Sequence, residues 1–286
     1  MEFVTLNTGA KMPLEGFGVF QVPDADVCEQ TVYDAVKTGY RLIDTAQAYM
    51  NEAAVGKAVS RVIADGLVSR EELFITTKLW VSNMKTEDGA YASLKESLEK
   101  LDMEYIDLVL LHQPMGDYFA GYRSLERAYK EGWVKAIGVS NFYPAILANL
   151  CDNVDIMPAV NQVELHPFFA QDDAITLMKE YGIVPQAWGP LAEGRHGIFT
   201  HPVLTDIGAK YGKTAAQIAL KWNTQRGVSI LPKSVHVERM EQNYDIWDFT
   251  LSDEDMQKIA ELDLGQSEIV DHSDPAFVKM INSFKI

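Results

Sequence analysis

Eight short apolar segments that alternate with helical patterns constrain the fold of this chain more than any other feature. Each segment is rich in Val, Ile and Leu, as expected for strands that are buried on both faces. The segments lie at 14–20, 41–46, 73–80, 105–112, 134–141, 159–165, 183–188 and 229–234. Between them, apolar residues follow the period of a helix, with Asp or Thr near the start and often Gly at the end. The alternation predicts an α/β protein with a parallel sheet, and a closed (β/α)8 TIM barrel is its simplest form.

Several segments lie outside this alternation. Residues 3–13 pair short apolar stretches around an Asn-Thr-Gly turn, which predicts an N-terminal β-hairpin that covers one end of the barrel. Helical patterns at 201–212 and 251–262 precede the seventh barrel helix and follow the eighth. The tail from Gly265 to Ile286 has no strong periodicity, so we expect it to wrap the surface as a loop. Because the chain has no repeat, low-complexity tract or flexible linker, residues 1–286 are predicted to form a single domain.

The charge of the chain limits the partners that it can bind. A formal net charge of -16 disfavours nucleic acid and anionic membranes, so any ligand that carries phosphate needs a local basic cluster. Cys28 and Cys151 are the only cysteines and are expected to be unpaired thiols without a metal. No signal-peptide pattern and no apolar run of about 18 residues is present. We therefore expect a cytoplasmic protein that acts on small molecules and, by default, is a monomer.

Two nucleotide-binding motifs are approached but not matched. The segment GAKYGKT at 208–214 has three residues between its first Gly and the GK, where a P-loop needs four, and it follows a helix. Gly212 is better explained as a helix end and Thr214 as the next N-cap. The GFG at 16–18 lacks the third Gly of a dinucleotide-binding fingerprint. The sequence therefore does not support a Rossmann domain.

Polar residues close three successive apolar segments of the predicted barrel. Asp44 ends the second segment, and Tyr49 follows it closely. Lys78 lies near the end of the third segment, and His112 ends the fourth. Because barrel active sites lie at the C-terminal ends of the strands, we expect these four side chains to converge at one barrel mouth.

These four residue types form a coherent set for reducing a carbonyl. Hydride addition creates an alkoxide that needs a proton, and a Tyr is a weak acid unless positive charge stabilises its phenolate. Lys78 would supply that charge, and Asp44 would pair with the buried ammonium. His112 would hydrogen-bond the carbonyl oxygen. Taken singly, Asp44, Tyr49 and His112 also have structural explanations, whereas a Lys that closes an apolar strand is seldom structural.

The segments DTAQAYMNEAAVG, TTKLW, DLVLLHQP, IGVSNF, NQVELHP and LPKS resemble the signature segments of the aldo-keto reductases in order and spacing. The resemblance runs from about residue 5 to residue 275, and the LHQP form is similar to the bacterial branch related to 2,5-diketogluconate and methylglyoxal reductases. In that family, residues matching Asp44, Tyr49, Lys78 and His112 form the catalytic tetrad, with Tyr as general acid. His at position 112, rather than Glu, implies reduction of carbonyls rather than of steroid double bonds.

The resemblance also implies an NADPH site. It places the nicotinamide carboxamide against Ser140, Asn141 and Gln162, and the nicotinamide ring against Trp188. Lys233, Ser234 and Arg239 supply the basic cluster that a 2′-phosphate needs, which favours NADPH/NADP+ over NADH. The full set of expected cofactor contacts is Ser140, Asn141, Gln162, Trp188, Gly189, Leu191, Lys233, Ser234, Val235, Arg239, Gln242 and Asn243.

At some positions the chain departs from the family pattern. Trp188 stands where the family often has Tyr, and Gly189 where it often has Ser, which removes a hydroxyl contact near the pyrophosphate. Gln242 replaces a frequent Glu, and Phe20 a frequent Trp. An aromatic substrate pocket is expected from Phe20, Trp80, Tyr118 and Phe119, while specificity is expected to depend on loops and on the tail.

The leading hypothesis is reversible NADPH-dependent reduction of aldehydes and ketones to alcohols. Two alternatives use the same fold. In an aldolase-type barrel, Lys78 would form a Schiff base with the substrate. In a regulatory protein, the chain would bind NADPH tightly as a sensor, without turnover.

Overall fold

The barrel predicted from the sequence is present. The structure, a computed structural model, describes residues 2–267 and 269–286. Eight strands form one sheet in which each strand pairs in parallel with the next in chain order. The strands are β3 (Gly16–Gly18), β4 (Leu42–Asp44), β5 (Phe74–Leu79), β6 (Leu108–Leu111), β7 (Ile137–Ser140), β8 (Val160–Glu164), β9 (Val184–Trp188) and β10 (Ser229–Ile230). Each lies within one of the eight apolar segments.

A seam between the first and last strands closes the sheet into a barrel. Glu15 and Ile230 form a parallel bridge there. The amide of Ile230 donates to the carbonyl of Leu14 at 2.8 Å, and the amide of Gly18 donates to the carbonyl of Pro232 at 3.2 Å. Backbone hydrogen bonds therefore join the last strand to the first, as in a closed barrel.

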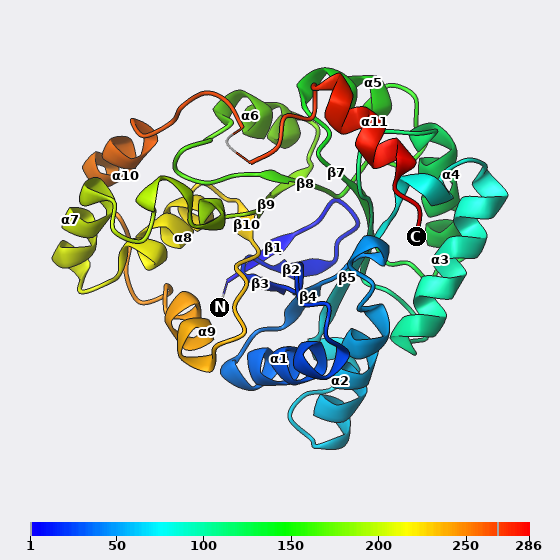
Figure 1. Cartoon of the computed structure of the whole chain (residues 1–286), viewed down its shortest axis with the longest axis horizontal. Helices are drawn as coiled ribbons and strands as arrows, with labels where there is room; N and C mark the ends of the chain where they lie inside the picture. Colours follow the sequence, from blue (N-terminus) through cyan, green and yellow to red (C-terminus); the bar gives the residue numbers. More distant parts are fainter. Residues whose placement is uncertain (1, 268) are drawn as a thin grey trace.

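Helices surround the barrel (Figure 1). They are α1 (Ala25–Thr38), α2 (Glu52–Ala64), α3 (Glu87–Leu101), α4 (Tyr118–Lys130), α5 (Pro144–Cys151), α6 (Asp172–Glu180), α7 (Pro202–Tyr211), α8 (Ala215–Gln225), α9 (Val237–Tyr244), α10 (Asp253–Ala260) and α11 (Pro275–Ser283). Their buried apolar faces and the outward faces of the strands form the main core. In the described part of the chain, no helix has the length and apolar character needed to cross a bilayer.

The helix signals of the GAKYGKT segment are confirmed. Gly212 follows α7 in the left-handed region, with φ of 67°. Thr214 begins α8 with a capping box, in which its hydroxyl accepts from the amide of Gln217 and the Gln217 side chain accepts from the amide of Thr214. The segment is therefore a helix end and a helix start, as its cap chemistry predicts.

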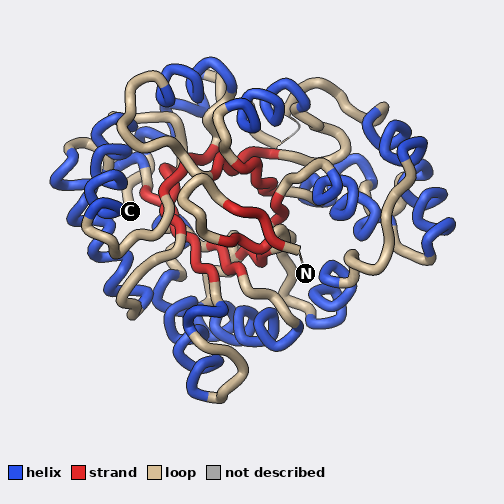
Figure 2. The backbone as a smooth tube through the Cα atoms, turned by 180° about the vertical axis from the view of Figure 1, so that it is seen from behind, coloured by secondary structure: helices blue, strands red, loops and turns tan. Residues whose placement is uncertain are grey.

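The hairpin closes the N-terminal end of the barrel, as predicted. Strands β1 (Phe3–Thr5) and β2 (Lys11–Pro13) are antiparallel, and they cross the barrel opening when it is seen from behind (Figure 2). Leu6 and Met12 are buried in a cluster with side chains from the starts of the strands, such as Leu42. The hairpin therefore seals this end of the barrel with apolar contacts, and the opposite end stays available for a site.

The expectation of a loop throughout the tail was wrong. Pro275–Ser283 forms helix α11, with Pro in its first turn and the side chain of Asp274 accepting from the amide of Ala276. Phe277 and Ile281 lie four residues apart and pack into an apolar cluster with Trp80. A helix this short draws its stability from packing against neighbouring elements, which a pattern search along the sequence does not register.

Candidate active site

The four residues expected at the barrel mouth do meet there. Asp44 ends β4, Tyr49 ends the short 3-10 helix η1 (Gln47–Tyr49), Lys78 lies in β5, and His112 follows β6. A cavity of about 710 Å³ opens at this end, and Asp44, Tyr49 and His112 line it. Lys78 is fully buried. The ammonium thus supports the cavity wall from inside the barrel, while the other three side chains face the space that a ligand would fill.

The ammonium of Lys78 makes three hydrogen bonds, which use all its donors. It donates to a carboxylate oxygen of Asp44, to the carbonyl of Thr45 at 2.9 Å, and to the hydroxyl of Tyr49 at 3.1 Å. Side chains from three different elements are therefore held in one rigid group. The remaining carboxylate oxygen of Asp44 accepts from the amide of Gln162 at 2.9 Å, which extends the network across the barrel.

Opposing effects set the protonation of this group. Burial lowers the pKa of Lys78, but the nearby Asp44 carboxylate and Tyr49 raise it to above its ordinary value, so the ammonium stays charged. Burial raises the pKa of Tyr49, and this outweighs the lowering effect of Lys78. Tyr49 therefore keeps its proton near neutral pH, and Lys78 lies where it would stabilise the phenolate once that proton leaves.

His112 faces Tyr49 across the cavity. Its ring lies edge-on to Tyr49, with centroids 5.6 Å apart, and edge-on to Trp80, with centroids 5.0 Å apart. Burial lowers the pKa of His112 far below its ordinary value, and Lys78 and His272 lower it further. The imidazole is therefore neutral and offers one N–H donor. A carbonyl oxygen between Tyr49 and His112 would meet two hydrogen-bond donors.

An amide platform lies beside this group, where the carboxamide contacts were expected. The side-chain nitrogen of Gln162 donates to Asp44 and, at 2.8 Å, to Gln186, which leaves its carbonyl oxygen for a ligand. The Ser140 hydroxyl donates to the backbone carbonyl of Gln162 at 2.8 Å. Ser140, Asn141 and Gln162 all line the cavity.

Asn141 also makes hydrogen bonds within the protein. Its side-chain nitrogen donates to the carbonyl of His112 at 3.2 Å, and its oxygen accepts from the indole N–H of Trp188 at 2.8 Å. The residue lies in the left-handed region, with φ of 64°. Asn141 thus fixes the orientation of Trp188, which lines the cavity and offers a flat surface for an aromatic ring.

The basic end of the expected cofactor site divides into two parts. Gly189, Leu191 and Lys233 line the cavity. Ser234, Val235, Arg239, Gln242 and Asn243 lie outside its lining, on and before α9. The Ser234 hydroxyl is engaged with His236, from whose amide it accepts at 3.0 Å. Lys233 and Arg239 are exposed and form no ion pair within the described residues, so both cations are available to a phosphate.

The four residues expected to form an aromatic substrate pocket do not all lie at the cavity. Phe20 and Trp80 line the cavity, but Tyr118 and Phe119 do not. Tyr118 begins α4, and its ring packs tilted against Phe119 and edge-on to Phe142, with centroids 4.8 and 5.4 Å away. The first turn of α4 thus directs both side chains into packing rather than toward the cavity.

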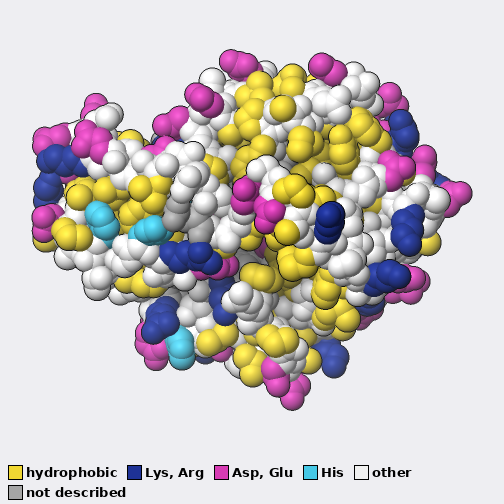
Figure 3. Space-filling model, turned by 45° about the horizontal axis from the view of Figure 1, so that its top comes forward, with side chains coloured by type: hydrophobic (Ala, Val, Ile, Leu, Met, Phe, Trp, Pro, Cys, Tyr) yellow, Lys and Arg dark blue, Asp and Glu magenta, His cyan; other side chains and the backbone are white. Residues whose placement is uncertain are grey.

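Later segments complete the lining in place of Tyr118 and Phe119. These residues, which the sequence analysis did not identify, are Phe199, Ile269, His272, Phe277, Ile281 and Phe284. Most of these residues come from the tail. On the surface, hydrophobic side chains gather on the face where α5 and α11 lie (Figure 3). The spacing of Phe277, Ile281 and Phe284, four residues and then three, is the one sequence signal that would have indicated a helix with an apolar face.

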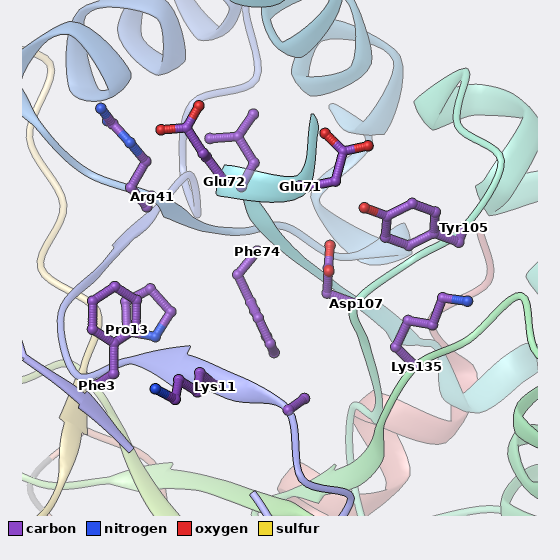
Figure 4. A pocket seen from close by; sticks show the side chains of 12 residues that line it. Phe3, Lys11, Pro13, Arg41, Glu71, Glu72, Phe74, Tyr105, Asp107 and Lys135 are labelled. Carbon is purple, nitrogen blue, oxygen red and sulfur yellow. The ribbon is translucent and has the colours of Figure 1, made fainter. Parts of the chain in front are cut away.

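A second cavity, of about 680 Å³, lies at the N-terminal end of the barrel (Figure 4). Its wall mixes cations with acidic groups: Lys11, Arg41, Lys135, Glu71, Glu72 and Asp107. The Arg41 guanidinium donates to two backbone carbonyls, and Asp107 pairs with Arg70 at 2.7 Å. These charges largely serve the fold, and the cavity lies at the end of the barrel opposite the strand-end cluster.

Comparisons with known proteins identify the family of this chain. Residues 16–264 match the sequence model of the Aldo/keto reductase family. The chain is 41% identical over 266 residues to methylglyoxal reductase DkgA of Escherichia coli strain K12, covering 92% of this chain and 94% of that protein. It is 43% identical over 261 residues to glyoxal reductase of Bacillus subtilis strain 168, covering 90% and 91%.

Solved structures of aldo-keto reductases also resemble this chain. A Bombyx mori aldo-keto reductase in complex with NADP superposes with a TM-score of 0.89 at 33% identity, covering 97% of this chain and 96% of that one. An aldo/keto reductase from Brucella melitensis superposes with a TM-score of 0.85 at 38% identity, covering 92% and 99%.

Proposed function

This chain belongs to the aldo/keto reductase family, and we propose that Tyr49 is the proton donor with which it reduces small aldehydes and ketones. The reaction class follows from the family: the protein is an NADPH-dependent oxidoreductase that converts carbonyls to alcohols. The roles of single residues are a further step, which the family alone does not give. They are supported by the contacts among Tyr49, Lys78, Asp44 and His112.

The residues at the mouth fit NADPH, which supplies the hydride when bound. Gln162 directs a free carbonyl oxygen toward a carboxamide, and Trp188 offers an aromatic face whose orientation Asn141 fixes. Gly189, with φ of 60°, has no side chain to block close approach of a phosphate. Lys233 lines the same cavity at its basic end. The chain thus presents amide, aromatic and cationic groups in the order in which a nicotinamide dinucleotide phosphate would need them.

Each member of the tetrad has a distinct proposed role. His112, neutral, donates to the carbonyl oxygen and orients it. Tyr49 donates its proton to the same oxygen as negative charge develops there, which general acid catalysis requires. Lys78 stabilises the resulting phenolate through its 3.1 Å contact, and Asp44 keeps Lys78 charged. In the reverse direction, the phenolate would accept the proton of the alcohol.

The burial of Lys78 disfavours the aldolase alternative. A Schiff-base lysine needs a lowered pKa and access to the substrate carbonyl. Lys78 is fully buried, its three donors are engaged, and its pKa is raised. These contacts favour Lys78 as an electrostatic partner of Tyr49 over Lys78 as a nucleophile.

The first substrates to test are small dicarbonyls and simple aldehydes, because the relatives include a methylglyoxal reductase and a glyoxal reductase. We also propose that the chain acts as a monomer in the cytoplasm. The observation that carries the proposed function is the 3.1 Å contact between Lys78 and Tyr49 at a cavity that His112 also lines.

The test is NADPH oxidation by the purified chain with methylglyoxal, glyoxal and propanal, with the alcohol product identified by NMR. We expect turnover with all three and a dissociation constant for NADPH well below that for NADH. Tight NADPH binding without turnover would instead favour the sensor alternative. Trapping of substrate on Lys78 by borohydride would favour the aldolase.

A further inference from the structure

The tail brings one further polar side chain to the mouth of the barrel. His272 lines the cavity together with Tyr49 and His112. Its ring packs between Tyr143 and Phe277, with centroids 5.5 and 5.3 Å away. These two aromatic contacts restrict the rotation of the imidazole. His272 therefore holds a defined place in the cavity wall.

The tail is anchored on both sides of His272. Before it, the hydroxyl of Ser267 donates to a carboxylate oxygen of Glu164 at 2.6 Å, and Glu164 is fully buried at the end of β8. After it, the indole N–H of Trp80 donates to the carbonyl of Phe284 at 2.8 Å. Both anchors lie on barrel strand ends, so the position of His272 is fixed relative to the reacting residues and not left to a free loop.

His272 keeps one polar atom that the fold does not pair. Its Nδ1 atom is buried and has no hydrogen-bond partner among the described residues. Burial lowers the pKa of His272 to about 4, against smaller raising effects of the Glu164 carboxylate, of a hydrogen bond to the Val270 carbonyl and of Asp271, so the ring is neutral. A neutral imidazole carries one donor and one acceptor. Because the neighbouring side chains in the wall are mainly aromatic, a polar group on the ligand would supply the hydrogen bond that such a ring lacks.

We propose that His272 is a specificity-determining residue that hydrogen-bonds a second oxygen of the substrate, beside the carbonyl held by Tyr49 and His112. The proposal rests on the proposed function. Because the ring is neutral and Glu164 lies nearby, a neutral second oxygen fits better than a carboxylate. The substrate class is therefore aldehydes with an adjacent carbonyl or hydroxyl, of which 2-oxoaldehydes are the simplest. An alkyl aldehyde would leave the imidazole unpaired and would be discriminated against.

The test compares kcat/KM for methylglyoxal and for propanal, two three-carbon aldehydes that differ in the second oxygen. In His272→Phe, which keeps the aromatic packing, we expect the ratio of the two values to fall about two- to tenfold, the effect of one hydrogen bond. His272→Gln keeps a donor and an acceptor and should recover part of the ratio. Both aldehydes are partly hydrated in water. Because every variant acts on the same solutions, this hydration does not affect the comparison of the ratio between variants.

Tyr143→Phe is the matched control, since it changes a neighbour of His272 that lies outside the cavity lining but keeps the packed ring and the imidazole. Its ratio should stay near that of the native chain, and the dissociation constant for NADPH should be unchanged in all three variants. An unchanged ratio in His272→Phe, or an equal loss on both aldehydes, would overturn the role of His272. Failure of the native chain to reduce either aldehyde would instead contradict the proposed function itself.

Discussion

The ammonium of Lys78 lies 3.1 Å from the hydroxyl oxygen of Tyr49, although the two residues belong to different elements, β5 and η1. Lys78 is fully buried in the barrel, whereas Tyr49 faces the cavity. This arrangement places a fixed positive charge behind the proposed proton donor. The cost of burying that charge is offset by Asp44, so the three residues depend on one another.

Asp44→Asn should destabilise the fold because it leaves the ammonium of Lys78 buried without its counter-ion. Breaking a buried pair in this way typically costs about 3–5 kcal/mol. The measurement is the free energy of unfolding from urea denaturation. Asp88→Asn serves as the control: its carboxylate pairs with Arg127 at the surface, so its loss should scarcely change stability. Equal stabilities of the two variants would show that the buried pair is not what holds this part of the barrel together.

His112 should stay in its active, neutral form well below neutral pH. Its pKa is far below the ordinary value of 6.5, because burial and the charge of Lys78 disfavour the imidazolium. We therefore expect the profile of kcat/KM against pH to be level as the pH falls through 6.5. A decline there that disappears in His112→Gln would mean that His112 titrates near its ordinary pKa, contrary to the structure.

Glu15 should make the folded chain less stable as the pH rises. It is fully buried at the barrel seam, where one oxygen accepts from the indole of Trp247 at 2.9 Å. Burial raises its pKa from 4.5 to about 8, against the lowering effect of hydrogen bonds from Trp247 and Tyr40. The folded chain holds this proton more tightly than the unfolded chain. The resulting contribution of Glu15 to the free energy of unfolding is therefore complete below about pH 4.5 and is lost as the pH rises through about 8.

Glu15→Gln removes that titration. One pKa unit corresponds to about 1.4 kcal/mol. Between about pH 4.5 and about pH 8, the free energy of unfolding of the native chain should therefore fall by several kcal/mol relative to that of the variant. Urea denaturation at a series of pH values measures the difference. Parallel stability curves for the native chain and Glu15→Gln would contradict a raised pKa at this position.

Helix α11 should contribute to aldehyde binding more than to cofactor binding. Removing residues 275–286 deletes Phe277, Ile281 and Phe284 from the cavity wall and breaks the hydrogen bond from Trp80. The predicted cofactor contacts lie elsewhere, on strand ends and before α9. We expect KM for aldehydes to rise several-fold and the dissociation constant for NADPH, measured by fluorescence quenching, to change little. The reverse pattern would place α11 at the cofactor.

Most of the barrel, and the meeting of four polar residues at its mouth, could be predicted because their signals are local. Each strand is a short apolar run, and Asp44, Lys78 and His112 are polar residues at the ends of such runs, so strand order alone brings them together. The caps at Gly212 and Thr214 are local in the same sense.

The parts that the sequence did not predict depend on packing. Tyr118 and Phe119 follow a strand end, but the rotation of α4 turns them away from the cavity, and rotation about a helix axis is set by neighbours. Helix α11 is stable through its contacts with residues such as Trp80, which is far away in the chain. His272 lies in a segment without periodicity, so its place in the same cavity wall as His112 follows only from how the tail folds back.

The proton transfer from Tyr49 is tested most directly by Tyr49→Phe, which removes the hydroxyl and keeps the ring beside Phe20 and His112. NADPH oxidation with methylglyoxal should slow by about 10²- to 10⁴-fold, the usual contribution of a general acid, while the dissociation constant for NADPH stays the same. Turnover equal to that of the native chain, with NADPH still bound, would show that Tyr49 is not the proton donor.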